Sequence, residues 1–332
     1  MRKLITLSLA LSLAGLTACA PTTAPASPAD TPAPTKVTLM LDWVPNTNHT
    51  GFFVAQTQGY FAAAGLEVAI VQPGEVYAEQ AVASGAADFG VSFQEQVTLA
   101  RADGVPLVSV AALIQHNTSG FAARSGLGVT SPKDWEGLKY GSFGSPFEAP
   151  TLRLLMTCAG GDFAKLQMVE TGFSDPLALL DAGQIDLAWI FYGWQGVQAR
   201  QQGLALDLVM LDEWFDCIPD YYTPVLIASE ATVAERPEVA RAFVGAVARG
   251  YAFAIQNPEQ AADLLVQAVP ELDADLVRES QAWLSPRYQA DAPRWGEQSA
   301  AVWQAYADWM TANGILSQPF DGSAAFTNAF LP

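Results

Sequence analysis

The chain has 332 residues, 51% of them hydrophobic, with 17 Phe and 9 Trp, which is enough for one large or two ordinary folded domains. Its formal net charge is −18. Such an acidic surface disfavours nucleic acids and anionic lipids as partners, because both are polyanions. It also disfavours long-range attraction of a phosphorylated ligand.

The N-terminus predicts export. Arg2 and Lys3 form a basic start, residues 4–14 are mostly apolar, and small residues precede Cys19. This order is typical of a secretory signal peptide, and the apolar run is too short to span a membrane. A cysteine at this place resembles a bacterial lipobox, so we expect residues 1–18 to be removed and Cys19 to become a lipid-anchored N-terminus. The protein would then lie outside a bacterial cytoplasmic membrane, in the periplasm or at the cell surface; an ordinary signal peptide that contains a cysteine is the alternative.

Residues 19–35 are predicted to be a linker, because they are rich in Pro, Ala, Thr and Ser. Such a sequence cannot bury apolar surface and samples extended conformations, so it would space the folded body from the membrane. Beyond the linker the only cysteines are Cys158 and Cys217. They could pair in a compartment outside the cytoplasm, but a sequence cannot show that two cysteines meet, and we expect two isolated thiols.

Short apolar segments alternate with helical ones after the linker. The predicted strands are 37–42, 66–71, 88–93 and 107–113, and the predicted helices between the first three are 52–64 and 79–84. Gly65 and Gly85 follow these helices, as expected of glycine at a helix C-terminus. This βαβ rhythm is typical of a mostly parallel sheet covered on both faces.

A second set of the same kind follows. The predicted strands are 138–142, 166–170, 185–190 and 206–211, with helices at 150–159, 176–181 and 193–202. Residues 222–228 are again apolar and β-rich, and a tail of helical periodicity covers 240–256, 258–269, 273–284 and 298–313.

Two α/β sets with a helical C-terminal tail predict two doubly wound lobes. The chain would cross between them near residues 119–124 and return near 222–225. We expect one lobe from 36–122 plus 225–332 and a second from 123–224. The two crossover strands would act as hinges, with a ligand cleft between the lobes.

Several strings along the chain are similar to those of one family. They are LDWVPNTNHTGF at 41–52, QGYF at 58–61, IQHNTSGF at 114–121, AWIFYGW at 188–194 and DYYTPV at 220–225. Through them the chain resembles the ThiY-type, or NMT1/THI5-like, group of type II periplasmic binding proteins of ABC importers. The resemblance spans the whole body after the linker.

The resemblance implies capture of a thiamin pyrimidine precursor, of the formylaminopyrimidine or hydroxymethylpyrimidine class. The lobes would close over it, and the closed form would deliver it to an ABC permease with its ATPase. The implied protein is a monomer without cofactor or metal. A binding protein for another small heterocycle, or a sensor or adhesin that keeps the same fold, are the alternatives among non-enzymes.

An aminopyrimidine needs aromatic faces for stacking and hydrogen-bond partners for its amino group and ring nitrogens. Open α/β sheets place ligands at the carboxyl ends of their strands. The ligand-binding residues predicted in the first lobe are Asp42, Trp43, Asn46, His49, Ser92 and Gln94. A turn or cap role for Asp42 and core packing for Trp43 are the alternatives.

The loop 141–148 follows a predicted strand and opens a helix, so it offers free backbone N–H groups. In relatives that hold a phosphorylated ligand the matching loop cradles phosphate. Here the loop carries Glu148 and neither Lys nor Arg, which favours an unphosphorylated ligand. We predict that Ser142 and Glu148 line the site.

An aromatic run leaves the third predicted strand of the second lobe. Large aromatics at a strand tip are difficult to bury together, although core packing of each is the alternative. The predicted ligand-binding residues here are Trp189, Tyr192, Trp194 and Gln195, with Tyr222 from the return crossover. Similar proteins often carry an acid where this chain has Gln195, so the particular pyrimidine stays open.

Catalysis is the rival hypothesis, because eukaryotic members of the resembling family synthesise hydroxymethylpyrimidine phosphate. They use a lysine and a histidine where this chain has Ser92 and Gln96, and a cysteine-rich run where it has 216–220 (DCIPD). A Schiff base needs an amine and iron needs several ligands. The only histidines are His49 and His116, and we expect His116 to be a structural hydrogen-bonding residue. We therefore predict a protein that is not an enzyme.

Overall fold

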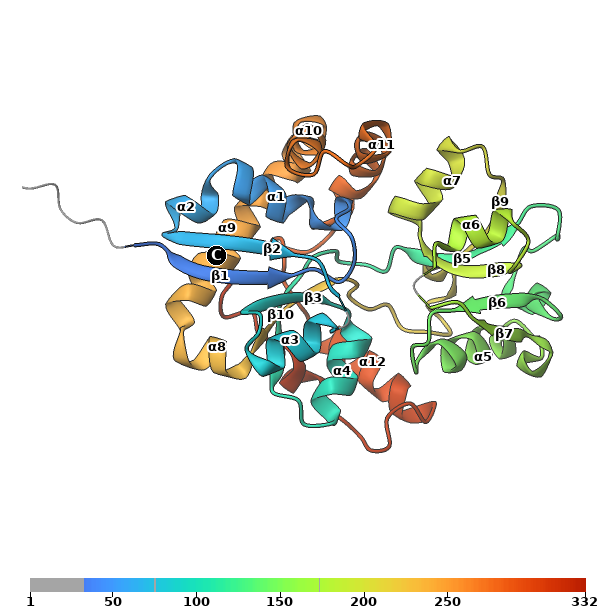
Figure 1. Ribbon diagram of the computed structural model, residues 1–332. Coiled ribbons are helices and arrows are strands. Elements are labelled where there is room, and N and C mark those ends of the chain that lie inside the picture. Colours follow the sequence, from blue (N-terminus) through green and yellow to red (C-terminus); the bar gives the residue numbers. More distant parts are fainter. Residues whose placement is uncertain (1–32, 75, 173) are drawn as a thin grey trace, which may run out of the picture. The chain divides into compact units, whose positions relative to one another are not determined.

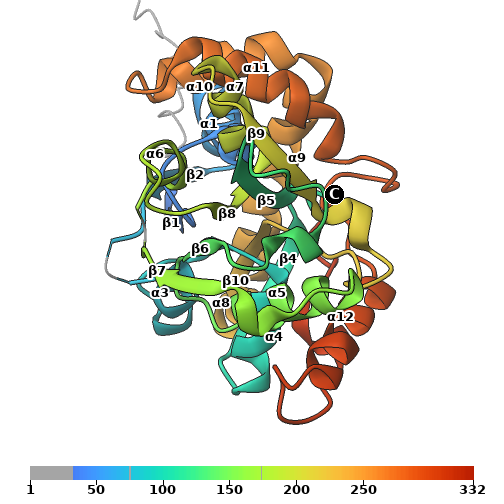
Figure 2. The same ribbon diagram turned by 90° about the vertical axis from the view of Figure 1, so that its right-hand side faces the viewer.

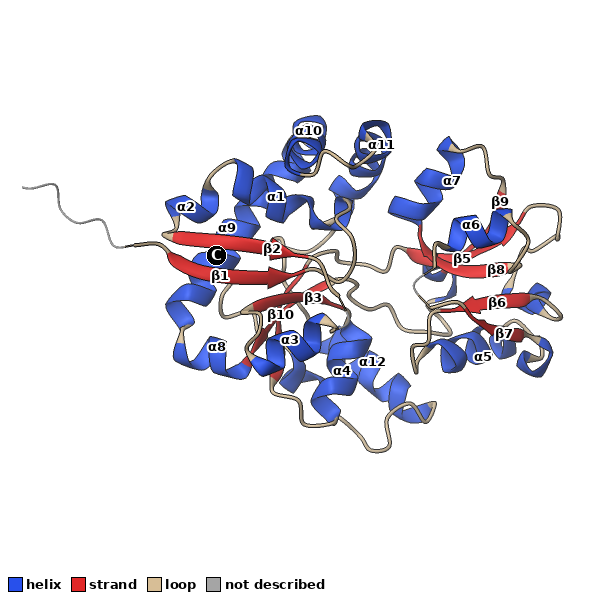
Figure 3. Ribbon diagram, viewed as in Figure 1, coloured by secondary structure: helices blue, strands red, loops and turns tan. Residues whose placement is uncertain are grey.

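Two five-stranded sheets account for the alternating apolar segments (Figures 1 and 3). The computed structural model of the chain describes residues 33–332, apart from residues 75 and 173. The predicted signal peptide, the lipidated Cys19 and most of the linker lie outside the described residues. Among those residues, no helix combines the length and apolar character needed to cross a bilayer.

The first sheet consists of β1 (Thr35–Met40), β2 (Leu66–Val71), β3 (Phe89–Ser92), β4 (Leu107–Ala112) and β10 (Val225–Ser229). Their order across the sheet is β2-β1-β3-β10-β4. Strand β1 is parallel to β2 and β3, whereas β10 is antiparallel to β3 and β4. The strand β10 therefore returns to the first sheet from the far half of the chain.

Helices cover both faces of this sheet. One face packs against α1 (Thr50–Thr57), α2 (Tyr60–Ala63), α9 (Pro237–Gln256) and α10 (Pro258–Ala268). The other face packs against α3 (Ala78–Ser84), α4 (Gln94–Ala102) and α12 (Ala300–Ala312). The remaining helices of the C-terminal half are α8 (Glu230–Glu235) and α11 (Ala274–Leu284), of which α11 packs against α10.

Helices α1 and α9 approach so closely that they require glycine at their crossing. A side chain at Gly250 would collide with the carbonyl group of Gly51. This contact fixes α1, and with it the loop between β1 and α1, against the longest helix of the fold.

The second sheet consists of β5 (Ser119–Arg124), β6 (Lys139–Ser142), β7 (Gln167–Glu170), β8 (Leu187–Phe191) and β9 (Leu206–Met210). Its order, β7-β6-β8-β5-β9, can be followed in Figure 2. As in the first sheet, the first three strands are parallel and the fourth, β5, is antiparallel to both neighbours. Helix α5 (Glu148–Cys158) packs on one face and α6 (Pro176–Asp181) and α7 (Val197–Gln201) on the other.

The chain passes between the sheets at residues 113–118 and 211–224. Residues 119–124, which we expected to be a crossover, form β5 with partners on both sides. The division into two ligand-enclosing lobes at residues 122 and 225 stays a proposal. Because the strands form two separate sheets, the two passages between them are the candidate hinges.

The predicted strands and helices correspond closely to the observed ones, with one interruption. The predicted helix 52–64 is two helices, α1 and α2, separated at Gly59, which has φ 70°. Gly85 caps α3 in the left-handed region, as predicted.

The prediction of two isolated thiols is wrong. Cys158, the last residue of α5, forms a disulfide with Cys217 in the second passage, across a Cα–Cα distance of 6.3 Å. The two cysteines are 59 residues apart in sequence, so only the tertiary fold brings them together. The bond attaches the second passage to the second sheet's own helix.

Candidate functional site

The carboxyl ends of the parallel strands carry most of the predicted site residues. Asp42 and Trp43 follow β1, and Ser92 ends β3 in the first sheet. Ser142 ends β6, and the predicted aromatic run begins on β8 in the second sheet. These are the edges at which open α/β sheets bind ligands.

Asp42 is held by a histidine. Its Oδ1 atom lies 2.6 Å from Nε2 of His49, which is completely buried. The Nδ1 atom of His49 accepts a hydrogen bond from the backbone N–H of Asn46, so Nε2 carries the proton and donates to Asp42. Within the described part of the chain, Oδ2 of Asp42 has no hydrogen-bond partner.

Asn46 has a local structural role. Its side-chain oxygen accepts a hydrogen bond from the Asn48 backbone, and its side-chain nitrogen donates to the Val44 carbonyl. Together with His49 it forms a capping box on the 3-10 helix Thr47–His49. Asn46 and His49 therefore shape the loop that presents Asp42.

Trp43 is half-buried. Among the described residues it has neither a ring contact nor a hydrogen bond, and it belongs to none of the hydrophobic clusters. Its indole is therefore available for a ligand, in contrast to the core packing that was the alternative.

The polar atoms of the next strand end are engaged within the chain. Ser92 donates to Glu79 of α3. Gln94 accepts from the backbone of Tyr222 at 2.8 Å, and the Tyr222 hydroxyl accepts from the Ser299 backbone at 2.8 Å. Gln94 and Tyr222 thus join the start of α4 to the second passage. Ligand contact by these three residues stays a prediction.

The loop before α5 closes around one carboxylate. Glu148, which is only 1% exposed, accepts hydrogen bonds from the backbone N–H groups of Phe143, Gly144 and Ser145 at 2.8–3.2 Å. The hydroxyl groups of Ser142 and Tyr140 donate to the same carboxylate at 3.0 and 2.7 Å. The negative charge also raises the pKa of Tyr140, in addition to the larger effect of burial.

Trp189 forms the centre of an aromatic wall. Its ring centroid lies 5.9 Å from that of Phe147, 6.3 Å from Phe143 and 5.0 Å from Phe121. Its indole N–H donates to Ser119, whose hydroxyl in turn donates to Asn117. Phe143 is 39% exposed and Trp189 is half-buried, so the wall presents aromatic surface at the edge of the second sheet.

The other members of the aromatic run lie in a π-helix, Tyr192–Gly196, a form frequent at functional sites. Tyr192 packs against Trp283 of α11 at 5.1 Å between ring centroids. Trp194 packs against the hydrophobic core of the first sheet. The Gln195 side-chain oxygen accepts one hydrogen bond from the Phe191 backbone at 3.0 Å, so its amide group keeps its N–H donors and a second lone pair on the oxygen.

Sequence reasoning missed buried polar groups that lack partners. Among the described residues, Oε2 of Glu95, Nδ2 of Asn117 and Oγ1 of Thr223 are buried without a hydrogen bond. Burial raises the pKa of Glu95 to about 8. Glu95 is the second residue of α4, and the other two lie on the two passages. The sequence offered one signal for each of these residues. Glu95 is next to Gln94, Asn117 lies in the string IQHNTSGF, and Thr223 lies in the string DYYTPV.

His116 forms two ion-pair contacts, one of which joins the two passages. His116 in the first passage lies 2.5 Å from Asp220 in the second and 2.9 Å from Asp291 of the C-terminal region. The hydrogen bond that His116 donates to Asp220 is the main reason that the pKa of His116 is raised to about 9. The expected structural role of His116 is consistent with these contacts. A cavity of about 290 Å³ adjoins it, lined by His116, Asn117, Thr118, Asp212, Phe215 and Arg287.

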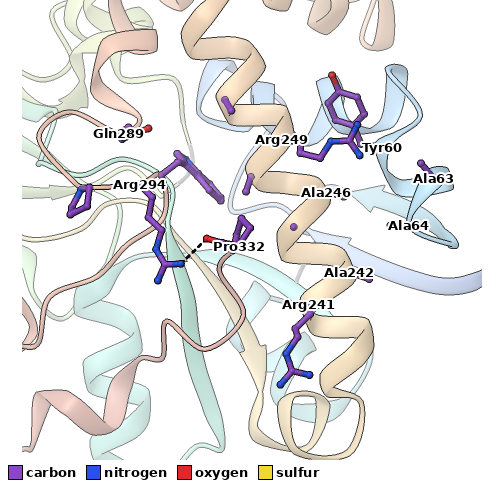
Figure 4. A pocket seen from close by; sticks show the side chains of 15 residues that line it. Tyr60, Ala63, Ala64, Arg241, Ala242, Ala246, Arg249, Gln289, Arg294 and Pro332 are labelled. Carbon is purple, nitrogen blue, oxygen red and sulfur yellow. Dashed lines mark hydrogen bonds between the residues drawn. The ribbon is translucent and has the colours of Figure 1, made fainter.

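A larger cavity lies elsewhere. It has about 640 Å³ and is built over α9, between α2 and the C-terminal residues (Figure 4). Alanine and glycine form its floor, and Arg241, Arg249 and Arg294 surround it. Arg249 lies over the ring of Tyr60. None of the predicted ligand-binding residues lines this cavity, and we do not assign the ligand to it.

In the described part of the chain, no group of three or more His, Cys, Asp or Glu side chains is placed to hold a metal ion.

Known proteins resemble this chain over nearly its whole length. The sequence model of the family described as NMT1/THI5 like matches residues 46–261. The formylaminopyrimidine-binding protein of Halalkalibacterium halodurans is 30% identical over 99% of both chains. The riboflavin-binding protein RibY of Chloroflexus aurantiacus is 32% identical over 100% of this chain and 99% of its own. The 4-amino-5-hydroxymethyl-2-methylpyrimidine phosphate synthase of Legionella pneumophila is 26% identical over 90% of this chain and 92% of its own.

Among solved structures, the alkanesulfonate-binding protein SsuA of Xanthomonas axonopodis pv. citri, bound to MOPS, superposes with a TM-score of 0.68. It is 18% identical and covers 89% of this chain and 98% of its own. At this identity the likeness shows the fold alone. The predicted α/β fold of a type II periplasmic binding protein is confirmed.

Proposed function

Because the chain belongs to the NMT1/THI5-like family, we propose that it binds a thiamin pyrimidine precursor and delivers it to an ABC importer. The ligand is an uncharged aminopyrimidine of the formylaminopyrimidine or hydroxymethylpyrimidine class. The protein is a monomer, held outside the membrane by a lipid on Cys19, and it presents the closed, loaded form to a permease with its ATPase.

The observation that carries this proposal is an aromatic wall at the ligand-binding edge of the second sheet, and a free carboxylate oxygen at the corresponding edge of the first sheet supports it. The wall around Trp189 offers stacking surface at the edge of the second sheet. Asp42, oriented by His49, keeps Oδ2 free at the edge of the first sheet. A flat ring stacked on the wall would direct its amino group to the carboxylate, a charge-assisted hydrogen bond that fixes the ring's orientation.

Closure would complete the site. The orphaned polar atoms of Asn117 and Thr223 lie on the two passages, and buried polar groups require partners. A heterocycle with alternating donors and acceptors along its edge supplies such partners. The contact of Tyr192 with Trp283 joins the second sheet's π-helix to α11. The two lobes would therefore already be in contact at this point before they close over the ligand. The ligand's binding free energy must exceed the free energy of closing the hinge.

A second candidate ligand is riboflavin, since a full-length relative at 32% identity is named for binding it. Its isoalloxazine ring is also flat and neutral and would stack on the same wall. It lacks the exocyclic amino group that Asp42 would accept from.

Synthesis of a pyrimidine phosphate is disfavoured as the function. Ser92 and Gln96 stand where the synthases that this chain resembles use lysine and histidine. Ser92 is instead a hydrogen-bond partner of Glu79, and Cys217 of the DCIPD stretch is in a disulfide. Neither the Schiff-base amine nor the set of iron ligands is present at these positions.

Isothermal titration calorimetry of the chain without its signal peptide tests the proposal. Formylaminopyrimidine, hydroxymethylpyrimidine, riboflavin and an alkanesulfonate form the panel. We expect saturable one-to-one binding of an aminopyrimidine and none of the sulfonate. Tighter binding of riboflavin than of every aminopyrimidine would replace the first candidate with the second, and a flat titration with all of them would refute both.

A further inference from the structure

The loop before α5 is a cradle for one anion. Backbone N–H groups of three successive residues, Phe143, Gly144 and Ser145, converge on a point at the N-terminus of this 11-residue helix. Two hydroxyl groups, from Ser142 and Tyr140, point to the same place. Convergent N–H groups at a helix N-terminus stabilise negative charge, and phosphate is a frequent occupant of such positions.

The occupant here is part of the chain. Both carboxylate oxygens of Glu148 accept these hydrogen bonds, and the residue is 1% exposed. The cradle is therefore filled and its positive potential is compensated. A second carboxylate, that of Glu170, lies beside Gly144 at the cradle's edge.

Among the described residues, no Lys, Arg or His forms an ion pair with Glu148 or Glu170. The loop 141–151 contains neither Lys nor Arg, and Arg153 of α5 lies over the ring of Phe163. A ligand phosphate would have to displace a hydrogen-bonded carboxylate or remain unpaired beside two negative charges.

The cradle adjoins the proposed ring site. Phe143 and Phe147, which flank it in the loop, are the residues that pack on Trp189. A phosphate attached to a ring stacked on that wall would therefore meet the cradle.

We propose that Glu148 is the residue by which this protein rejects phosphorylated forms of its ligand, acting as a built-in anion in a cradle that would otherwise take phosphate. The statement that a heterocycle stacks beside the cradle rests on the proposed function. The statement that Glu148 occupies an anion site does not.

Glu148 also shapes the loop, so loss of binding after its replacement would be uninformative. The test is a gain of anion binding, which a purely structural role does not produce. Glu148→Ala empties the cradle, and Glu148→Gln keeps the side-chain shape while removing the charge. Glu259→Ala is the matched control, because Glu259 is an exposed acid in the first turn of α10, a helix of the same length.

The first measurement is thermal unfolding with and without inorganic phosphate. We expect Glu148→Ala to have a lower Tm than the wild type in chloride and to regain part of it as phosphate is added. Wild type and Glu259→Ala should not respond. An equal response of all proteins to phosphate, or none from a folded Glu148→Ala, would overturn the proposal. Because no heterocycle is involved, this result is independent of whether the proposed function is correct.

The second measurement is the ratio of affinities for a phosphorylated and an unphosphorylated ligand, by calorimetry. Riboflavin 5′-phosphate against riboflavin, and hydroxymethylpyrimidine phosphate against hydroxymethylpyrimidine, are the two pairs. We expect the ratio to rise about tenfold or more in Glu148→Ala and several-fold in Glu148→Gln, in whichever pair the wild type binds. An unchanged ratio in Glu148→Gln would contradict the proposal even if Glu148→Ala did not fold.

Discussion

His49 donates a hydrogen bond from Nε2 to Oδ1 of Asp42 across 2.6 Å, from a position with no solvent exposure of its own side chain. The histidine is itself fixed through Nδ1 by the Asn46 backbone. One oxygen of Asp42 is thereby committed, and the other has no hydrogen-bond partner among the described residues. A carboxylate that is already oriented loses little conformational freedom when it binds, which favours affinity.

Replacing Asp42 should weaken binding of an aminopyrimidine. Asp42→Asn keeps the size of the side chain but removes the charge that strengthens the hydrogen bond to the ligand's amino group. Hydrogen bonds to charged groups contribute about 1.5–3 kcal/mol, so we expect Kd to rise about 10- to 100-fold. Calorimetry of this variant beside Asp103→Asn, an exposed aspartate at the end of α4, checks it. Equal affinities in the two variants would show that Asp42 only shapes the loop.

Trp189 should report binding through its fluorescence. Stacking of a heterocycle on its indole would quench emission, and Trp189→Phe would remove most of the ligand-dependent change. Trp214→Phe is the control, because Trp214 packs against the same hydrophobic cluster and should leave the change intact. The same loss of signal from both variants would mean that the quenching does not come from the wall.

Glu95 should make the folded state less stable at high pH. Burial raises its pKa from 4.5 to about 8, so the folded protein keeps a proton that the unfolded chain loses. The free energy of unfolding therefore falls as pH rises from 4.5 to about 8 and levels off above it. Glu95→Gln has no such proton, so its stability at about pH 9 should exceed that of the wild type by a few kcal/mol.

Urea unfolding of the wild type and Glu95→Gln at acidic and alkaline pH measures this difference. At about pH 4.5, where the wild-type carboxyl is protonated in the folded state, the two should be similar. A constant difference across the pH range would show that Glu95 is not a buried neutral acid.

Whereas the folded state favours the neutral form of Glu95, it should favour the charged form of His116. Its pKa is raised from 6.5 to about 9, chiefly by the hydrogen bond to Asp220, so its protonated form stabilises the folded state. This contribution is complete below pH 6.5 and is lost as pH rises through about 9. The side chain is about half exposed, so the contribution should be about 1 kcal/mol or less.

His116→Gln should therefore be less stable than the wild type at about pH 6 and similar at about pH 10. Denaturant titration of both proteins at these two pH values measures the difference. Because Glu95 is unchanged in this pair, its own titration cancels. A variant that is less stable by the same amount at both pH values would refute a role for the charge.

The disulfide should contribute to stability through the unfolded chain. It closes a loop of 59 residues, and cross-linking a loop of this length stabilises by up to about 4 kcal/mol through chain entropy. The double variant Cys158→Ser/Cys217→Ser should unfold at lower denaturant concentration than the oxidised wild type. Reduction of the wild type should reproduce the shift, and no change on either treatment would show that the bond is absent in solution.

Most of the fold could be predicted because its signals are local. Apolar runs bounded by glycine define the strands, and the spacing of apolar residues defines the helices of the C-terminal half. The break between α1 and α2 was missed because residues on both sides of Gly59 are helical, so the segment reads as one helix. The place of residues 119–124 inside the second sheet, rather than between the sheets, was missed because their partners, β8 and β9, follow much later in the sequence.

The site was less predictable because its roles depend on tertiary contacts. The strand ends predicted where Asp42 and Trp189 lie, and ligand contact by them stays a prediction; they did not predict that His49 and Asn46 serve the loop itself. Glu148 was expected to repel a phosphate, whereas its burial in a ring of donors appears only in the structure. Glu95 was overlooked beside Gln94, because nothing in a sequence shows that an acid in the first turn of a helix is buried without a partner.

A structure of the complex with the heterocycle that binds most tightly in the calorimetric panel tests the central claim most directly. The account predicts the ring stacked against Trp189, with its polar edge toward Asp42 and the passages that carry Asn117 and Thr223. A ligand held by aliphatic or cationic side chains, for example in the arginine-rimmed cavity over α9, would contradict it.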